Sequence, residues 1–543
     1  MTFFWTSPFG PVALLAIGGL LLIVLDRRLP PRRLAWASCA IAGLAWVSWL
    51  LLRLQAGLEA VQWLWSPPLS LPTSLQFRLL PGSWLAGLIV LLVAFVFLAL
   101  PGWSRRPGFV SARVWLLFLA AQALLVLLAG NWLTLLGLWV GLVLLAGLAA
   151  GGAASVRAWS YGVLGSLFLI SAPLFNGGRS LEASLDTLAL NLQAQFLVIL
   201  AVAITLAAYP FHLWLLPSGG QGREEPPLTG QRLAAHLVPA LAALYLLGLF
   251  DLPLLATQAW APLGTVALLG SAVAAWAEQD EQRARVFLLV NRCAWALLVV
   301  GLAQTNNVVV SLLALLSLGL GASLWALAGA GQRPARRNWP LWLAAAVWFG
   351  LPFTPGFVPT LGLASLAGTW IAAPGWLVLL LAQGLFIATF FSWPAPAPAA
   401  PAPADLGPVA LQVALAPVAG AVIWYALAPQ ALASLLGASV QPASAPISVP
   451  LGAVTVLQWL TLFLSLALGG LLLRTGDRWF GAWRSGQRLA ASLAGLDWLA
   501  AALGRVSHLL RVVLSFIADL VDGAGQFGWV ILVVLVAWLL LRG

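Results

Sequence analysis

The chain has 543 residues, of which 62% are hydrophobic and only 8% are charged. This composition excludes an ordinary water-soluble domain and predicts an integral membrane protein. The net charge of +11 comes from 26 basic residues, all of them arginine. Their position between apolar runs indicates membrane orientation rather than nucleic-acid binding.

Apolar runs of about 17 to 25 residues, the length that an α-helix needs to cross a bilayer, recur along the whole chain. They predict an all-α polytopic membrane protein with about 16 transmembrane helices. Thirty tryptophans accompany these runs, and we interpret most of them as anchors at the membrane interface. The predicted spans are 9–25, 34–54, 83–101, 111–129, 131–150, 157–176, 192–216, 231–250, 262–277, 284–303, 308–330, 340–372 with an interruption, 375–394, 408–428, 453–473 and 526–542.

Arginines gather in the loops that follow odd-numbered spans. Arg27 and Arg28 follow the first span, Arg106 follows the third, and Arg336 and Arg337 follow the eleventh. Positively charged loops stay on the cytoplasmic side of the membrane. The pattern therefore predicts that the N-terminus lies outside.

The C-terminal third differs from the apolar runs before it. Residues 392–408 form a Pro/Ala linker, and residues 474–523 carry polar side chains on one side of an apolar periodicity. The second segment predicts an amphipathic helix, or two, lying along the membrane interface. The predicted division is a transmembrane bundle over 1–473, this interfacial segment, and a last transmembrane helix over 524–543.

Prolines predict breaks in two of the spans. Pro210 removes a backbone donor from the seventh span, directly before a histidine in the stretch YPFHLWLLP (209–217). Pro352 and Pro355 do the same in the twelfth, where Gly356 permits a non-helical turn. Backbone carbonyls released at such breaks need other partners inside a membrane.

PFHLWLLP (210–217) resembles the PFHxWLP motif that ends the seventh helix of a known family. The family comprises the antiporter-like membrane subunits of respiratory complex I (NADH:quinone oxidoreductase), Mrp-type cation/proton antiporters and membrane-bound hydrogenases. Further resemblances occur in the family's order over residues 77–360. FRLLPGS (77–83) is similar to FRLDPLS, QRLAAHLVPALAALYLL (231–247) to the eighth helix, AEQDEQRARVF (277–287) to the start of the tenth, and LPFTPGFVPT (351–360) to the break in the twelfth.

The resemblance implies a line of buried charges for proton movement, which this chain lacks. The positions that hold a glutamate and lysines in the family correspond here to Val140, Thr205, Leu241 and Thr360. None of these side chains ionises. The chain is therefore identified as a divergent member without the proton-line charges.

A few ionisable residues remain within or beside the predicted spans. His212, His236 and Glu278 are candidates for a rearranged proton relay, since histidine titrates near neutral pH. The other interpretation is that the two imidazoles cap broken helix ends. Arg292 is too costly to leave alone in a membrane and predicts an ion pair, either with Glu278 or with a carboxylate of a partner.

These observations predict a structural, proton-inert subunit of a redox-linked membrane complex in a bacterial plasma membrane, with other membrane subunits as partners. The chain would not be catalytic alone, although its complex would be an NADH:quinone oxidoreductase-like translocase. An alternative is an active proton or cation translocating subunit that uses His212, His236 and Glu278. A polytopic glycan polymerase or ligase would need a large charged extracytoplasmic loop, which the sequence lacks. No cofactor or metal site is predicted, since Cys39 and Cys293 belong to no ligand cluster.

Overall fold

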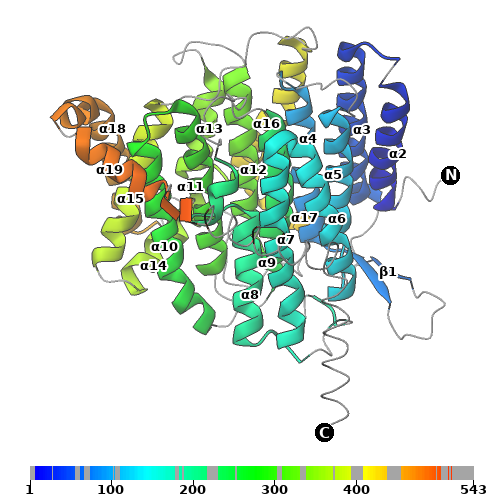
Figure 1. The fold of residues 1–543 in the computed structure, drawn as a ribbon, viewed down its shortest axis with the longest axis horizontal. Helices are drawn as coiled ribbons and strands as arrows, with labels where there is room; N and C mark the ends of the chain where they lie inside the picture. Colours follow the sequence, from blue (N-terminus) through cyan, green and yellow to red (C-terminus); the bar gives the residue numbers. More distant parts are fainter. Residues whose placement is uncertain are drawn as a thin grey trace.

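The computed structural model describes residues 7–26, 28–55, 61–65, 74–101, 103, 111–177, 181, 183–185, 189–216, 230–250, 254–302, 308–330, 338–370, 373–392, 406, 408–436, 454–482, 484–496 and five short pieces between 498 and 515. Within them the chain is an all-α polytopic bundle, as predicted (Figure 1). Ten helices are long and apolar enough to cross a membrane, and five more are shorter and apolar.

The helices follow the predicted spans in order. They are α2 (Phe9–Leu25), α3 (Pro31–Gln55), α4 (Pro81–Ala99), α5 (Ala112–Leu127), α6 (Trp132–Ala150), α7 (Gly152–Phe175), α8 (Leu192–Thr205), the 3-10 helix η1 (Phe211–Trp214), α9 (Gly230–Leu249), α10 (Leu254–Ala277), α11 (Glu281–Leu302), α12 (Val308–Ala330), α13 (Trp339–Phe349), α14 (Phe357–Trp370), α15 (Ala373–Ser392), α16 (Pro408–Leu427), α17 (Pro429–Leu436), α18 (Val456–Ala482) and α19 (Arg484–Ala494).

A short antiparallel hairpin between α3 and α4 was not predicted. Strand β1 (Val61–Trp65) pairs with β2 (Leu75–Leu79), with Trp63 opposite Phe77. β2 also pairs with the connection between α5 and α6, where the Arg78 amide donates to the carbonyl of Leu128 at 2.7 Å. The hairpin lies at the end of the bundle opposite the α2–α3 turn (Figure 1).

The core lies where α4, α9, α11 and α12 meet, because these helices are almost completely buried while α7 and α18 are mostly exposed. In Figure 1, α2 and α3 lie at one end of the row of helices and α18 and α19 lie at the other. α19 packs against α10. Exposed apolar side chains on α7 and α18, such as Leu167 and Phe463, face lipid or a neighbouring protein.

Several tryptophans lie buried between helices and are not at the membrane interface by exposure, whereas the interpretation of most tryptophans as interfacial anchors stays a prediction. Trp49 and Trp84 join α3 to α4 by two reciprocal hydrogen bonds, each indole donating to the other residue's backbone carbonyl at 2.8 and 3.0 Å. An indole ring fills a large internal volume, which explains its use between helices. The other fully buried tryptophans are Trp132, Trp139, Trp295, Trp325 and Trp348.

The C-terminal predictions are only partly described. α18 continues to Ala482 and α19 follows from Arg484, so helical structure crosses the predicted boundary at residue 473. The last predicted transmembrane helix, 524–543, and the linker residues 393–405 lie outside the described residues. The division into three parts stays a prediction.

Candidate functional site

Both predicted helix breaks are present. α8 ends at Thr205, and the chain turns through Ala207, at a φ of 48°, before η1 begins at Phe211. α13 ends at Phe349, Gly350 adopts the left-handed conformation, and α14 begins at Phe357. Glycine adopts this conformation without steric cost, so Gly350 as well as the predicted prolines makes the second break possible.

The carbonyls released at the end of α13 are satisfied by side chains from other segments. The carbonyl of Ala346 accepts from the Thr354 hydroxyl at 3.3 Å, that of Val347 from Ser317 at 3.2 Å, and that of Trp348 from Arg292 at 2.6 Å. The last turn of a helix leaves such acceptors without partners in the helix itself. Arg292 therefore caps α13.

Arg292 lies midway along α11 and is almost completely buried. Its guanidinium also donates to Asn291 at 2.7 Å and to Gln383 of α15 at 3.4 Å, and it lies over the ring of Phe386, 3.6 Å from the centroid. These partners are neutral. No carboxylate among the described residues forms an ion pair with Arg292, so the predicted pairing with Glu278 is wrong.

Glu278 belongs to a different environment, the connection between α10 and α11. Its carboxylate accepts from the Arg283 guanidinium at 2.9 Å and from the amide of Gln279 at 3.0 Å. This ion pair orders the start of α11 at one end of the bundle. Among the described residues, Glu278 makes no direct contact with either histidine.

His212 lies on η1 and is fully buried. Its ring stacks on Tyr209, with 5.1 Å between centroids, and packs against Phe287 of α11 at 5.0 Å. Neither ring nitrogen has a hydrogen-bond partner of acceptable geometry within the described part of the chain. The ring fills space between aromatic neighbours.

His236 of α9 is also fully buried. Its Nε2 lies 3.7 Å from the sulfur of Cys293, and its ring meets Trp214 edge to face at 5.4 Å. The two histidines thus contact α11 at residues 287 and 293, six residues apart, which corresponds to about 9 Å along a helix. No direct contact between the two rings is present among the described residues.

The four positions of the family's proton line have four different environments. Leu241 is fully buried, whereas Val140 on α6 is 44% exposed on the outside of the bundle. The Thr205 hydroxyl donates to the carbonyl of Ala201 in its own helix at 2.9 Å. The Thr360 hydroxyl is buried and has no partner among the described residues. These positions form no continuous polar path.

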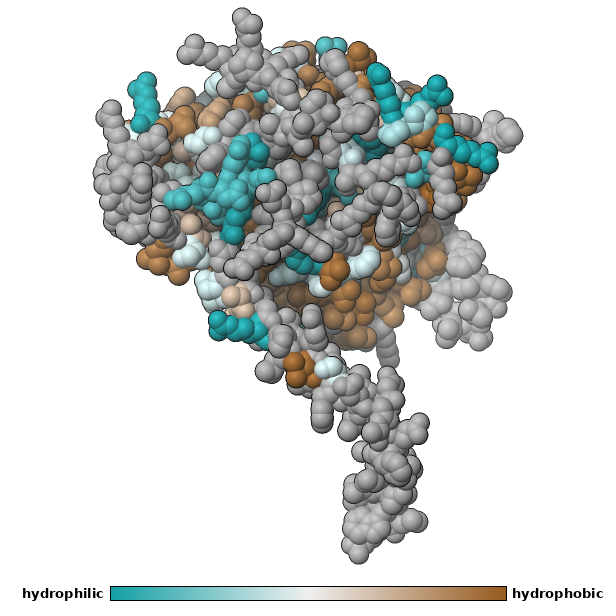
Figure 2. All heavy atoms as spheres, turned by 45° about the horizontal axis from the view of Figure 1, so that its top comes forward, coloured by the Kyte–Doolittle hydropathy of each residue, from teal (hydrophilic) through white to brown (hydrophobic). Residues whose placement is uncertain are grey.

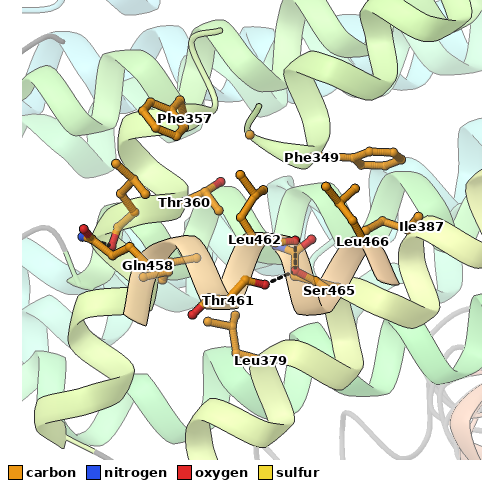
Figure 3. Close-up of a pocket in the computed structure, with 14 residues that line it drawn as sticks. Phe349, Phe357, Thr360, Leu379, Ile387, Gln458, Thr461, Leu462, Ser465 and Leu466 are labelled. Carbon is orange, nitrogen blue, oxygen red and sulfur yellow. Dashed lines mark hydrogen bonds between the residues drawn. The ribbon is translucent and has the colours of Figure 1, made fainter. Parts of the chain in front are cut away.

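Thr360 lines a small cavity at the break between α13 and α14 (Figure 3). Its volume is about 20 Å³, which holds a water molecule or an ion of similar size. Four segments form its walls, namely the end of α13, α14, α15 and α18. The polar lining side chains are Thr360, Gln383, Gln458, Thr461 and Ser465.

Sequence reasoning missed this cavity and the residues around Arg292. Asn291, Ser317 and Gln383 are single polar residues in long apolar helices. Their signal in the sequence is that a buried polar side chain needs a partner, but the partners come from helices far apart in the chain. The identity of those partners required the fold.

The chain is thus a polytopic membrane protein with discontinuous helices. Two of its membrane-length helices are interrupted, and a buried arginine lies at one of the interruptions. Neither a protein-family model nor a curated protein sequence matches the chain.

Solved structures do match. A chain of the Mrp complex from Dietzia sp. DQ12-45-1b has a TM-score of 0.69 and 19% identity, covering 97% of this chain and 62% of that one. A chain of respiratory complex I from Thermus thermophilus has a TM-score of 0.56 and 20% identity, covering 78% of this chain and 99% of that one. A chain of the membrane-bound sulfane sulfur reductase, an archaeal respiratory membrane complex, has a TM-score of 0.68 and 15% identity, covering 98% of this chain and 100% of that one.

At these identities the likeness is one of fold. It confirms for this chain the fold of the matched chains, as the sequence resemblance predicts. The chain spans 62% of the length of the Mrp chain that it matches.

Proposed function

We propose that the chain is a structural subunit of a multi-subunit membrane complex of the Mrp or respiratory kind, and that it does not itself move protons. The observation that carries this proposal is the environment of Arg292. A guanidinium stays protonated throughout the physiological pH range, so it does not take up and release protons in a cycle.

A fixed positive charge midway along α11 also opposes the passage of other cations. Coulomb repulsion acts over longer distances where the surroundings are poorly polarisable, as they are in a helix bundle inside a membrane. The neutral partners of Arg292, Asn291 and Gln383, leave that charge uncompensated by any side chain that the structure describes. Unless an anion balances it, that charge makes the site a barrier rather than a pathway.

The substituted proton-line positions support the same function. Leu241 offers no polar atom, and Val140 faces outward, where it contacts lipid or a partner. The Thr205 hydroxyl is already bonded within its helix. A relay needs groups that change protonation state and lie within hydrogen-bond reach of one another.

The alternative, an active translocator through His212, His236 and Glu278, has one observation in its favour. Both nitrogens of His212 and Nδ1 of His236 are buried and lack partners among the described residues, and water molecules are suitable partners for such atoms. Against it, the Glu278 carboxylate forms an ion pair with Arg283. The two rings also contact α11 at residues six positions apart.

Ion flux into proteoliposomes that contain the purified chain distinguishes a structural subunit from a translocator. An imposed proton or sodium gradient is expected to decay no faster than in empty vesicles, and His212→Ala is expected to leave the decay unchanged. His508→Ala is the matched control, because His508 plays no part in the alternative. A saturable flux that is lost in His212→Ala and kept in His508→Ala would overturn the proposal in favour of the translocator.

We further propose a bacterial plasma membrane with the N-terminus outside. Arg28 follows α2, Arg157 lies near the start of α7, and Arg283 lies at the start of α11, so alternation of the helices brings them to the same end of the bundle. Figure 2 shows hydrophilic side chains gathered on the face that forms the top of Figure 1, with hydrophobic side chains on the flank below. Such an end lies in the cytoplasm by the positive-inside rule.

A further inference from the structure

Two hydrogen-bonding side chains in the cavity between α13, α14, α15 and α18 have a donor without a partner among the described residues. Gln383 is 5% exposed, and its Nε2 has no partner among the described residues. Its Oε1 accepts from the Arg292 guanidinium at 3.4 Å, which fixes the orientation of the amide. A flipped amide would set two donors against each other, so Nε2 is held on the side away from Arg292.

The second available donor is the hydroxyl of Thr360. It is buried, has no partner in the described part of the chain, and lines the same cavity as Gln383. Thr360 lies one turn into α14, whose N-terminus at Phe357 is also part of the lining (Figure 3). The N-terminal end of α14 carries partial positive charge and the C-terminal end of α13, which also lines the cavity, carries partial negative charge, so the two helix ends offset each other there.

The other polar side chains of the cavity already have partners. Gln458 donates to the carbonyl of Leu361 at 3.1 Å, and Ser465 donates to that of Thr461. The Thr461 hydroxyl donates to Leu457 at 2.7 Å and accepts from the Trp376 indole at 2.8 Å. No carboxylate is part of the lining among the described residues.

We propose that this cavity binds a small monoatomic anion, chloride or another halide, as the counter-charge of Arg292. Gln383 couples the two, since one end of its amide accepts from the guanidinium and the other donates into the cavity. Two unsatisfied donors and a nearby buried cation disfavour a metal cation there. The inference does not depend on the proposed function, because the charge of Arg292 needs balancing whether or not the subunit moves protons.

Thermal unfolding of the purified chain tests the site. Cys39 and Cys293 are both buried, so a thiol-reactive fluorophore reports unfolding. At constant ionic strength, the midpoint is expected to rise saturably as chloride or bromide replaces gluconate, because a ligand that binds only the folded state stabilises it. Equal midpoints in chloride and gluconate would overturn the proposal.

Two variants link that effect to this cavity. Thr360→Val removes one donor at constant shape and is expected to raise the half-saturating chloride concentration about tenfold, the usual effect of a hydrogen bond to a charged group. Thr389→Val is the matched control on α15, since the Thr389 hydroxyl donates to Leu385 at 2.8 Å and does not line the cavity. It is expected to keep the wild-type chloride dependence, and the same loss in both variants would contradict the assignment.

Gln383→Glu supplies a carboxylate beside Arg292 in place of the anion. Its midpoint is expected to be independent of chloride and, in gluconate, at least as high as that of the wild type in chloride. Retention of the wild-type chloride dependence would contradict the proposal. In crystals grown with bromide, an anomalous scattering peak is expected between Thr360 and Gln383, whereas a peak-free cavity at saturating bromide would show that only water occupies it.

Discussion

The guanidinium of Arg292 on α11 donates to the backbone carbonyl of Trp348 at 2.6 Å and so caps the interrupted helix α13. The negative end of a helix dipole stabilises a cation placed against it. Arg292, the charged residue midway along α11, is thus hydrogen-bonded to the helix break itself. Each of these two features therefore stabilises the other.

Replacing Arg292 by methionine is therefore expected to destabilise the chain although it removes a charge from the membrane. The carbonyl of Trp348 and the amide of Asn291 would lose their donor, at a cost of about 2 kcal/mol or more in the free energy of unfolding. Arg33→Met, at an exposed position at the start of α3, is the control and is expected to change stability by less than about 0.5 kcal/mol. Thermal unfolding in detergent measures both. A methionine variant as stable as the wild type would show that the cap is dispensable.

His212 is expected to act through the shape of its ring. His212→Phe keeps the packing between Tyr209 and Phe287, so it should cost less than about 1.5 kcal/mol in unfolding free energy. His212→Ala leaves a cavity and should cost about 2 to 4 kcal/mol. A phenylalanine variant as unstable as the alanine variant would contradict this. It would show that the ring nitrogens of His212 contribute a stabilising interaction that the packing of the ring does not supply.

Close approach of α12 and α13 depends on Gly321, because a methyl group there would overlap the indole of Trp348. Gly321→Ala is expected to lower the free energy of unfolding by about 1 to 3 kcal/mol through overpacking. At Gly420 on α16, by contrast, an added methyl group would meet no other atom. Gly420→Ala should therefore be neutral or stabilise by about 0.5 to 1 kcal/mol through helix propensity. Equal effects of the two substitutions would be inconsistent with this packing.

Single cysteines test the orientation of the chain in intact cells. Gln279 lies at the arginine-rich end, between α10 and α11, and the exposed Gln193 lies at the opposite end, in the first turn of α8. A membrane-impermeant thiol reagent should label Gln193→Cys and spare Gln279→Cys until the membrane is opened. Background is low because Cys39 and Cys293 are buried. The reverse pattern would place the N-terminus inside.

Native purification tests whether the chain belongs to a complex. An affinity-tagged chain, extracted in mild detergent, is expected to elute with stoichiometric membrane partners at a mass well above its own 57.2 kDa. The apolar side chains exposed on α7, Leu167 and Leu174, are candidate contacts. Leu167→Arg should weaken partner recovery, since a buried unpaired charge is costly in an interface. Recovery of the chain alone in quantity would count against the proposed role.

The sequence predicts the break after α8 and the break between α13 and α14, because proline and glycine act locally on the backbone. It does not predict how the breaks are satisfied. The partner of Arg292 is a backbone carbonyl of residue 348, 56 positions away, and every residue has a carbonyl, so nothing in the sequence marks this one. The expected pairing with Glu278 failed for that reason, whereas pairing with a carboxylate of a partner stays a prediction.

The anion cavity was hidden for a related reason. Thr360, Gln383 and Ser465 each interrupt a different apolar helix and become neighbours only when α14, α15 and α18 pack. The hairpin of β1 and β2 was missed because its strands are five residues long, too short for an alternating pattern to stand out from an apolar background.

The reciprocal indole bonds of Trp49 and Trp84 restrict how the bundle deforms. A slip of α3 along α4 by one helical turn, about 5.4 Å, would break both bonds at once and leave two indole N–H groups without partners in a medium that offers no replacements. These two helices therefore move as a single rod. Any rearrangement transmitted through the subunit by its neighbours has to be absorbed elsewhere, and the two interruptions, after Thr205 and after Phe349, are the places where the backbone already departs from helical geometry.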